Sequence, residues 1–252
     1  MTNRVIIVTG AASGIGQAIA EHFATEGWRV TLVDKDAVRG RAVAEAIGGL
    51  FVEADLAQRQ ACRHVVDATL EHYGGVDALV NNAGFQHIAP IEEFDEDAWD
   101  ALLAVMLTAP FLLMKYAWPT MKAQGWGRVV NIGSVHSLRA SPFKCGYISA
   151  KHGVLGLTRT AALEGGPHGI TVNTICPAYV RTPLVENQIA AQAQTRGIPE
   201  AEVVERVMLE PVAVKRLIEP SEVAGLVSYL CSDAAGAVTG VAWTIDLGWT
   251  AH

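Results

Sequence analysis

Three side chains near the middle of the chain have the types and spacing for proton transfer at an alcohol or a ketone. Tyr147 and Lys151 are four residues apart, which places them on one face of a helix, and Ser134 precedes Tyr147 by thirteen residues. A phenol with a pKa of about 10 is a poor base at neutral pH, but a neighbouring ammonium group favours the phenolate. We therefore expect Lys151 to lower the pKa of Tyr147, and Ser134 to hydrogen-bond the same substrate oxygen. Taken alone, this spacing also occurs in ordinary helices.

A glycine-rich segment near the start of the chain has the spacing of a dinucleotide-binding turn. It follows an apolar run over residues 5–9 and leads directly into a helical pattern. Glycines permit a tight turn close to a ligand, and the N-terminus of a helix favours a pyrophosphate. We expect a dinucleotide to contact Gly10, Ser13, Gly14, Ile15 and Gly16.

The end of the second apolar run predicts NAD rather than NADP. Asp34 lies 18 residues after Gly16, where a carboxylate can accept hydrogen bonds from the ribose hydroxyls and repel a 2′-phosphate. No Arg or Lys lies in the glycine-rich turn to bind that phosphate, although Lys35 is a cation beside the acid. The residues that follow the third and fourth apolar runs are also expected to contact the cofactor: Asp55, Leu56, Asn82, Ala83 and Gly84. The alternative role for Asp55 is to cap the helix that follows it, and the two roles are compatible.

Buried apolar runs alternate with helical patterns along the whole chain. Strands are expected near residues 5–9, 29–33, 50–54, 76–81, 127–133, 170–176 and 241–245. Helices are expected near residues 15–26, 36–47, 58–73, 95–124, 147–164 and 220–232. This alternation predicts an α/β fold with a parallel sheet and helices on both of its faces.

A polar segment interrupts the alternation before the last helix. Two helical stretches, 184–195 and 200–209, lie between the sixth and seventh expected strands. Insertions at the carboxyl edge of such a sheet are often lids over a substrate, so we expect a helical lid at about residues 182–212, with a passive surface excursion as the alternative. No repeat or linker is present, which favours a single domain over residues 1–252.

The composition of the chain disfavours several classes of partner. Its 252 residues carry a formal net charge of −7, which disfavours nucleic acid as a partner. The four cysteines are scattered and match neither a metal site nor a disulfide framework. No run reaches the ~18 consecutive apolar residues of a membrane span, and the first residues lead straight into a strand, not a signal peptide. These features predict a cytoplasmic protein that acts on a small molecule, without a metal or a membrane.

Together, the motifs resemble those of the short-chain dehydrogenase/reductase family. Residues 9–16, 81–84, Ser134, the Tyr147/Lys151 pair and 177–183 follow the pattern of the family in order over essentially the whole chain. The resemblance implies a doubly wound, Rossmann-type sheet of seven parallel strands, usually in a homotetramer. It also implies that Tyr147, Lys151, Pro177, Val180 and Thr182 contact the nicotinamide cofactor.

One position departs from the family pattern. Members usually carry a catalytic Asn in the helix after the fourth strand, in a context like Val-Asn-Leu-Thr, whereas this chain reads Val105-Met106-Leu107-Thr108. A Met side chain cannot hold the water that the Asn is thought to organise beside the active-site lysine. Either backbone carbonyls hold that water or the proton relay differs.

The charge distribution suggests a negatively charged substrate. Residues 101–163 contain no Asp or Glu, although they contain seven Lys and Arg residues. His136 and Lys144 lie between Ser134 and Tyr147, where a substrate must lie, and such groups suit a carboxylate. The alternative is that Lys144 is a solvated loop residue.

Within the family, five segments look like those of the bacterial D-3-hydroxybutyrate dehydrogenases: residues 84–87, 134–136, 141–144, 183–188 and 248–252. This resemblance implies NAD-dependent interconversion of D-3-hydroxybutyrate and acetoacetate. The carboxylate-binding residues that it implies are Gln86, His136, Lys144 and Gln188. Ser134 and Tyr147 are expected at the reacting oxygen, and we expect Tyr179 and Trp249 to form an apolar wall for the methyl group. A 3-oxoacyl thioester reductase, another short-chain alcohol dehydrogenase or a catalytically silent dinucleotide-binding scaffold are the alternatives.

Overall fold

A computed structural model describes residues 3–251. Residues 1, 2 and 252 lie outside the described residues, so the last residue of the expected segment 248–252 is not described. Seven parallel strands form one sheet in the order β3-β2-β1-β4-β5-β6-β7. The strands are β1 (Val5–Thr9), β2 (Arg29–Asp34), β3 (Leu50–Glu53), β4 (Ala78–Asn81), β5 (Gly127–Ile132), β6 (Ile170–Pro177) and β7 (Ala242–Ile245). The doubly wound parallel sheet expected from the sequence is therefore confirmed.

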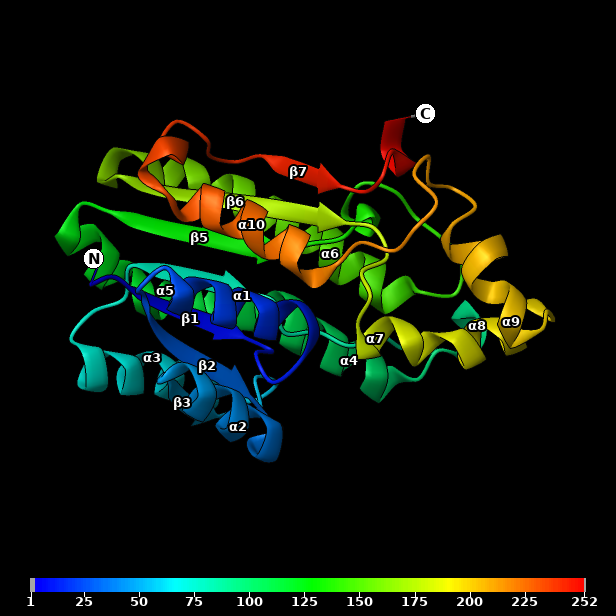
Figure 1. Cartoon of the computed structure of the whole chain (residues 1–252), viewed down its shortest axis with the longest axis horizontal. Helices are drawn as coiled ribbons and strands as arrows, with labels where there is room; N and C mark the ends of the chain where they lie inside the picture. The colour runs from blue at the N-terminus through cyan, green and yellow to red at the C-terminus, as the bar shows by residue number, and fades with distance from the viewer. Residues whose placement is uncertain (1–2, 252) are drawn as a thin grey trace.

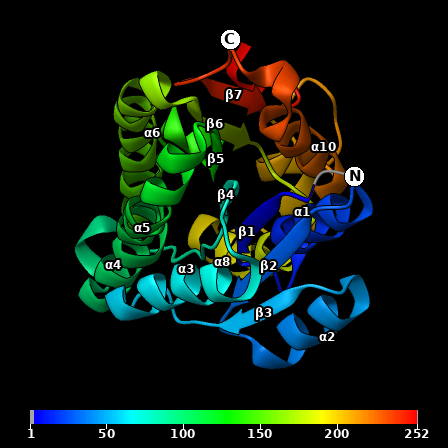
Figure 2. The ribbon, with the colours of Figure 1, turned by 90° about the vertical axis from the view of Figure 1, so that its left-hand side faces the viewer.

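Helices cover both faces of the sheet, as the end-on view shows (Figure 2). One face is covered by α1 (Gly14–Thr25), α2 (Ala37–Ile47) and α10 (Pro220–Cys231). The other face is covered by α3 (Arg59–Tyr73), α5 (Ala109–Gln124) and α6 (Cys145–Gly165). The central strands are buried on both sides, which explains why they read as continuous apolar runs.

The strand order reverses between β1 and β4, and this reversal opens a crevice at the carboxyl ends of both strands. The chain moves outward from β1 to β3 and then returns to place β4 on the other side of β1. Asn82 ties the two strand ends together, because its Nδ2 donates to the Thr9 carbonyl oxygen at 2.8 Å and its backbone N–H donates to Thr9 Oγ1 at 2.9 Å. Ligands of open α/β sheets bind at such a reversal.

A chain of buried polar side chains fixes α6 to the sheet. Asn81 on β4 donates to Asn131 Oδ1 on β5 at 2.8 Å, and Asn131 donates to Thr158 Oγ1 on α6 at 2.8 Å. The Thr158 hydroxyl also lies 2.7 Å from the Thr174 hydroxyl on β6. The helix is thereby held in one position against three strands.

The long helix expected at residues 95–124 has an irregular turn in its middle. It consists of α4 (Glu96–Leu103), the π-helical turn η2 (Ala104–Thr108) and α5. Pro110 has no N–H for the Met106 carbonyl, and the Ala109 N–H donates five residues back, to Ala104. The helix expected at residues 95–124 is therefore confirmed, with a π-helical turn in its middle that the sequence did not predict.

This helical run, Glu96–Gln124, is the one described helix that is long and apolar enough to cross a membrane by length and composition. Leu113, Ala117 and Met121 on α5 are fully buried in the core against the sheet. Packing inside the fold thus accounts for the apolar character of much of this helix.

The segment between β6 and α10 forms a small helical unit beside the carboxyl edge of the sheet, on the right in Figure 1. It contains α7 (Pro183–Glu186), α8 (Gln188–Arg196), α9 (Glu200–Val203) and the π-helical turn η5 (Val204–Met208). Val185, Ala193, Val203 and Met208 form a separate hydrophobic cluster within it. A parallel bridge between Val180 and Ile218 joins its two ends, so the enclosed residues, 181–217, slightly exceed the expected 182–212.

Candidate active site

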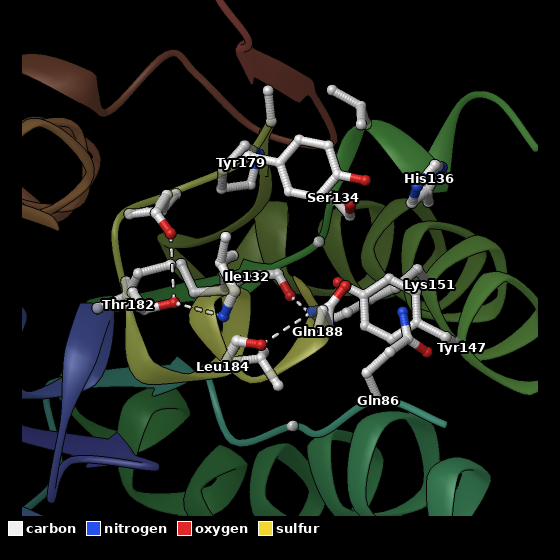
Figure 3. Close-up of a pocket in the computed structure, with 18 of the residues that line it drawn as sticks. Gln86, Ile132, Ser134, His136, Tyr147, Lys151, Tyr179, Thr182, Leu184 and Gln188 are labelled. Carbon is white, nitrogen blue, oxygen red and sulfur yellow. Dashed lines mark hydrogen bonds between the residues drawn. The ribbon is translucent and has the colours of Figure 1, made fainter. Parts of the chain in front are cut away.

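Two adjoining cavities open at the carboxyl edge of the sheet. The smaller, of about 110 Å³, is lined by Ser134, Tyr147, Lys151 and all the expected carboxylate-binding residues. Figure 3 labels three of the latter, Gln86, His136 and Gln188. The larger, of about 430 Å³, extends over the glycine-rich turn to Asp34 and Asp55. Both cavities share the residues Ile15, Asn82, Gly84, Thr182 and Leu184.

The end of β5 and the start of α6 bring the three predicted catalytic residues together. Ser134 follows β5 and caps a short 3-10 turn, Val135–Ser137, in which its side chain accepts from the Ser137 N–H. Its hydroxyl proton is then available to a partner in the cavity. The Lys151 ammonium group donates to the Ile132 carbonyl at 2.6 Å, which anchors the helix that also carries Tyr147 to the strand end.

Burial dominates the electrostatics of the Tyr147/Lys151 pair. Burial raises the pKa of Tyr147 to about 12, although a hydrogen bond from Ser134 opposes this shift. Burial lowers the pKa of Lys151 to about 8. The loss of solvation thus outweighs the hydrogen bond from Ser134, and a lowering of the phenol pKa by Lys151 stays a prediction.

Lys144 also lines the smaller cavity. Its side chain is only 4% exposed, and its ammonium group donates to the Tyr179 hydroxyl at 3.4 Å. No Asp or Glu among residues 3–251 forms an ion pair with it. The preceding residue, Phe143, has a φ of 69°, a strained conformation for a bulky side chain that directs the backbone into the site. Lys144 is thus a buried cation, not a solvated loop residue.

Two glutamines present amide donors in the lining of the same cavity. The Gln86 Oε1 atom accepts from the His87 N–H at 3.2 Å, which leaves the two amide protons of Gln86 available. Gln188 donates one amide proton to the Leu184 carbonyl at 3.1 Å and retains a second (Figure 3). The loop of Gln86 and the loop of Lys144 are joined by a hydrogen bond from the Ala89 N–H to the Phe143 carbonyl at 3.0 Å.

The buried His136 is neutral at pH 7. Burial and the nearby Lys144 lower its pKa to about 4. Its Nδ1 atom lies 3.3 Å from the Arg139 carbonyl, and its ring makes edge contacts with Tyr147 and Trp249 at centroid distances of 6.3 and 5.8 Å. These contacts fix the orientation of the imidazole in the wall of the smaller cavity.

The glycine-rich turn fits the pyrophosphate of a dinucleotide. A Cβ atom at Gly16 would lie 2.1 Å from the Gly10 carbonyl oxygen, so only glycine allows α1 to approach the strand this closely. Ser13, at the N-cap of α1, makes no capping hydrogen bond with its side chain, which leaves N–H groups of the first turn for an anion. Gly16 itself is not in the lining of either cavity.

The two predicted acids of the cofactor site lie in the larger cavity. Asp34 ends β2, and its carboxylate accepts from the N–H groups of Ala12 and Asp36, each at 3.0 Å. Asp55 accepts from the Ala57 N–H at 3.0 Å, whereas Gln58 occupies the N-cap position of α3. The alternative that Asp55 caps this helix is therefore wrong. Both carboxylates retain lone pairs for a ligand.

The remaining predicted cofactor residues are distributed over the two cavities. Leu56 and Ala83 line the larger cavity, whereas Pro177 and Val180 line the smaller one. Thr182 lines both and also caps α7, where its Oγ1 accepts from the Val185 N–H at 3.4 Å. This cavity pair, the close-packed glycine turn and Asp34 suit a nicotinamide dinucleotide. Within residues 3–251, no group of three or more His, Cys, Asp or Glu side chains is placed to hold a metal ion.

Met106, the departure from the family pattern, is buried beneath the cavities. A Cβ atom at Gly84 would lie 2.9 Å from its sulfur, and its side chain belongs to a small cluster that also contacts Tyr147. Sequence reasoning did not find the polar role of Tyr179 or the buried Gln192, whose Nε2 lies 3.5 Å from the Tyr179 hydroxyl. No spacing in the sequence signals that contact.

Comparisons with known proteins agree with this geometry. A family model described as enoyl-(acyl carrier protein) reductase matches residues 10–250. A D-beta-hydroxybutyrate dehydrogenase of Rhizobium meliloti is 44% identical over 256 residues, covering 99% of both chains. A second, of Cupriavidus necator, is 39% identical and covers all of both chains. An uncharacterized oxidoreductase of Bacillus subtilis is 44% identical over the full length of both.

A solved structure supports the same assignment. The crystal structure of levodione reductase superposes with a TM-score of 0.92 at 35% identity, covering 100% of this chain and 99% of the other. The agreement extends from the glycine-rich turn to the residues after β7, and no large part of the chain is unmatched. The chain therefore belongs to the short-chain dehydrogenase/reductase family, whose oxidoreductases use nicotinamide dinucleotide cofactors.

Proposed function

We propose that the protein is an NAD-dependent dehydrogenase that interconverts D-3-hydroxybutyrate and acetoacetate. The observation that carries the proposal is the buried ammonium group of Lys144, which has no acidic partner among the described residues. A buried charge without a counter-ion is costly, so the site is suited to a ligand that supplies a negative charge. The names of two relatives at 44% and 39% identity support the same substrate.

The size and polarity of the smaller cavity favour a short acid. Its volume of about 110 Å³ suits a molecule of a few carbon atoms. Lys144 and the two amide groups of Gln86 and Gln188 would bind the carboxylate at one end, with His136 beside them. Tyr147 and Ser134 would then face the carbinol or carbonyl oxygen at the other end.

In the direction of oxidation, the Tyr147 phenolate would accept the proton of the substrate hydroxyl while Ser134 donates a hydrogen bond to the same oxygen. The bound nicotinamide dinucleotide supplies the acceptor for the hydride of the carbinol carbon. Lys151, anchored at Ile132, would stabilise the phenolate by its charge. In reduction, Tyr147 donates its phenol proton to the oxygen.

The preference for NAD follows from Asp34. Its carboxylate is held by two backbone N–H groups at the end of β2 and would accept hydrogen bonds from ribose hydroxyls while repelling a 2′-phosphate. Lys35 also lines the larger cavity and is the candidate partner for such a phosphate. We expect Asp34→Asn to lower the ratio of kcat/KM for NAD to that for NADP by at least about tenfold.

One assay tests the substrate assignment. Reduction of NAD by the purified protein is measured with D- and L-3-hydroxybutyrate, longer 3-hydroxy acids, and the methyl ester of D-3-hydroxybutyrate. We expect the highest kcat/KM with the D-acid and a loss of about 10- to 100-fold with the ester, because the ester has no charge for Lys144 to bind. Equal kcat/KM for the acid and the ester would reject the carboxylate-binding role.

Two other results would point to the alternatives. Turnover of acetoacetyl thioesters without turnover of the free acid would assign a 3-oxoacyl thioester reductase. Binding of NADH without turnover of any hydroxy acid or ketone would assign a silent dinucleotide-binding scaffold. We also propose a homotetramer in the cytoplasm, as the resemblance implies, and analytical ultracentrifugation would measure the number of subunits.

A further inference from the structure

Tyr179 lies beside Lys144 in the wall of the smaller cavity, and its ring is held in place from one side. It stacks on Trp249 with ring centroids 5.6 Å apart and an interplanar angle of 30°. The apolar wall expected from the sequence accounts for this ring contact. It does not account for the hydroxyl group.

The Tyr179 hydroxyl oxygen is the shared acceptor of two donors. Lys144 Nζ donates to it at 3.4 Å, and Gln192 Nε2 donates to it at 3.5 Å. Both lone pairs of the oxygen are thereby engaged, and the hydroxyl proton remains for a third partner. Among residues 3–251 the hydroxyl donates to no acceptor, while the residue lines the cavity.

We infer that the Tyr179 hydroxyl donates a hydrogen bond to the carboxylate of the substrate and so binds it together with Lys144. The hydroxyl oxygen would accept a hydrogen bond from the Lys144 ammonium group, while the hydroxyl proton is donated in a hydrogen bond to the carboxylate. The cation and the hydroxyl would therefore bind the same carboxylate. A hydrogen bond to a charged group contributes more than one between neutral groups. The inference rests on the proposed function and adds a specificity-determining residue to it.

Gln192 is the positioning residue for this hydroxyl. It lies on α8, one turn after Gln188, and is only 2% exposed. It does not line the cavity, and its Oε1 atom is buried without a hydrogen-bond partner among the described residues. A buried polar atom without a partner lowers stability, so the amide is better explained by the hydroxyl that it orients than by a contribution to folding.

Tyr179→Phe tests the inference, because it keeps the stacked ring and removes only the hydroxyl. We expect KM for D-3-hydroxybutyrate to rise about tenfold, kcat to change less than twofold, and KM for the methyl ester to stay within twofold. Tyr229→Phe, on α10 and 39% exposed, is the matched control and should change none of these values. An unchanged KM for the acid in Tyr179→Phe would mean that Tyr179 is only an apolar wall.

Gln192→Leu tests the positioning role. We expect it to raise KM for the acid about threefold in the wild-type background and to have no further effect in the Tyr179→Phe background, because the hydroxyl is then absent. Equal effects in both backgrounds would overturn this role. Melting temperatures of all variants show whether a change in KM accompanies a loss of folding.

The design separates this inference from the proposed function. If the wild type oxidises the acid and Tyr179→Phe has the same KM, only the role of Tyr179 fails. If the wild type does not oxidise the acid, the proposed substrate fails. The same variants are then titrated with acetate in complex with NADH, and weaker acetate binding by Tyr179→Phe would support the anion-binding role, whereas equal binding would overturn it.

Discussion

At Tyr147 and Lys151, burial shifts each group away from its charged form. The pKa of the phenol rises to about 12 and that of the ammonium group falls to about 8. The neutral phenol is the form that donates a proton to a ketone. The phenolate that oxidation requires becomes more populated as the pH rises.

We therefore expect kcat for oxidation to rise as the pH is raised from 7 to 10, and kcat for reduction to change little, because a phenol with a pKa of about 12 stays protonated over this range. Steady-state rates in both directions at saturating cofactor measure this. Tyr147→Phe should lower both rates by at least about 100-fold at every pH, with NADH binding within threefold of the wild type. Oxidation that slows as the pH rises would contradict the role of Tyr147 as the proton acceptor.

Replacing Lys144 should weaken substrate binding and raise the stability of the chain. We expect Lys144→Met to raise KM for the acid about 10- to 100-fold and to leave KM for the methyl ester within twofold. The same change should raise the melting temperature, because it removes a buried cation that lacks an ion pair. Lys122→Met, at an exposed position on α5, is the control for the loss of one charge. Equal KM changes for acid and ester would exclude carboxylate binding by Lys144.

At the scale of elements, the catalytic helix α6 depends on the buried polar chain that joins it to β4, β5 and β6. Thr158 is the junction of this chain, since its hydroxyl accepts from Asn131, lies 2.7 Å from the Thr174 hydroxyl and donates to the Val154 carbonyl at 2.8 Å. Tyr147 and Lys151 lie on the same helix, toward its N-terminus. The stability of the chain and the position of these residues are therefore linked through one hydroxyl.

We expect Thr158→Val to lower the free energy of unfolding by about 1–3 kcal/mol, because the isosteric side chain leaves the Asn131 amide without its acceptor. Urea denaturation measures the change. Thr160→Val, at an exposed position on the same helix, should change stability by less than about 0.5 kcal/mol. Similar values for both variants would show that the buried chain contributes little to stability.

At the scale of the whole molecule, buried neutral His136 links stability to pH. Its pKa is about 4 in the folded chain and about 6.5 in an unfolded one, so the unfolded state binds more protons between these values. Stability from this group is therefore present above about pH 6.5 and is lost as the pH falls toward 4, by up to about 3 kcal/mol.

Melting temperatures between pH 7 and pH 4.5 measure this dependence. We expect His136→Gln to weaken the fall, because the glutamine side chain does not titrate. His64→Gln, at an exposed position on α3, is the control and should leave the slope unchanged. The same slope in His136→Gln and in the wild type would assign the acid sensitivity to other groups.

Much of the fold could be predicted because local patterns determine it. Apolar runs such as Val5–Thr9 and helix ends such as Gly48 and Gly74 depend on residues close in sequence. The irregular turn at Ala104–Thr108 could not be predicted, because Pro110 is compatible with either a helix end or a distortion.

The candidate site likewise has features that the sequence predicts and features that it does not. The spacing of Tyr147 and Lys151 predicts their common helix face, and the structure brings them to the cavity. It cannot predict the direction of their pKa shifts, which depends on burial by distant segments. The contact between Tyr179 and Gln192 joins the end of β6 to α8, and no sequence pattern reports such a pairing.

The unpaired Lys144 ammonium group also makes the choice of buffer an experimental variable. Acetate, formate or citrate would compete with a short acid for this cation, so KM measured in them would be overstated and melting temperatures would be inflated. An amine buffer such as Tris carries no carboxylate and leaves this cation to the substrate. Kinetic and thermal data on this chain are comparable only when the buffer anion is the same.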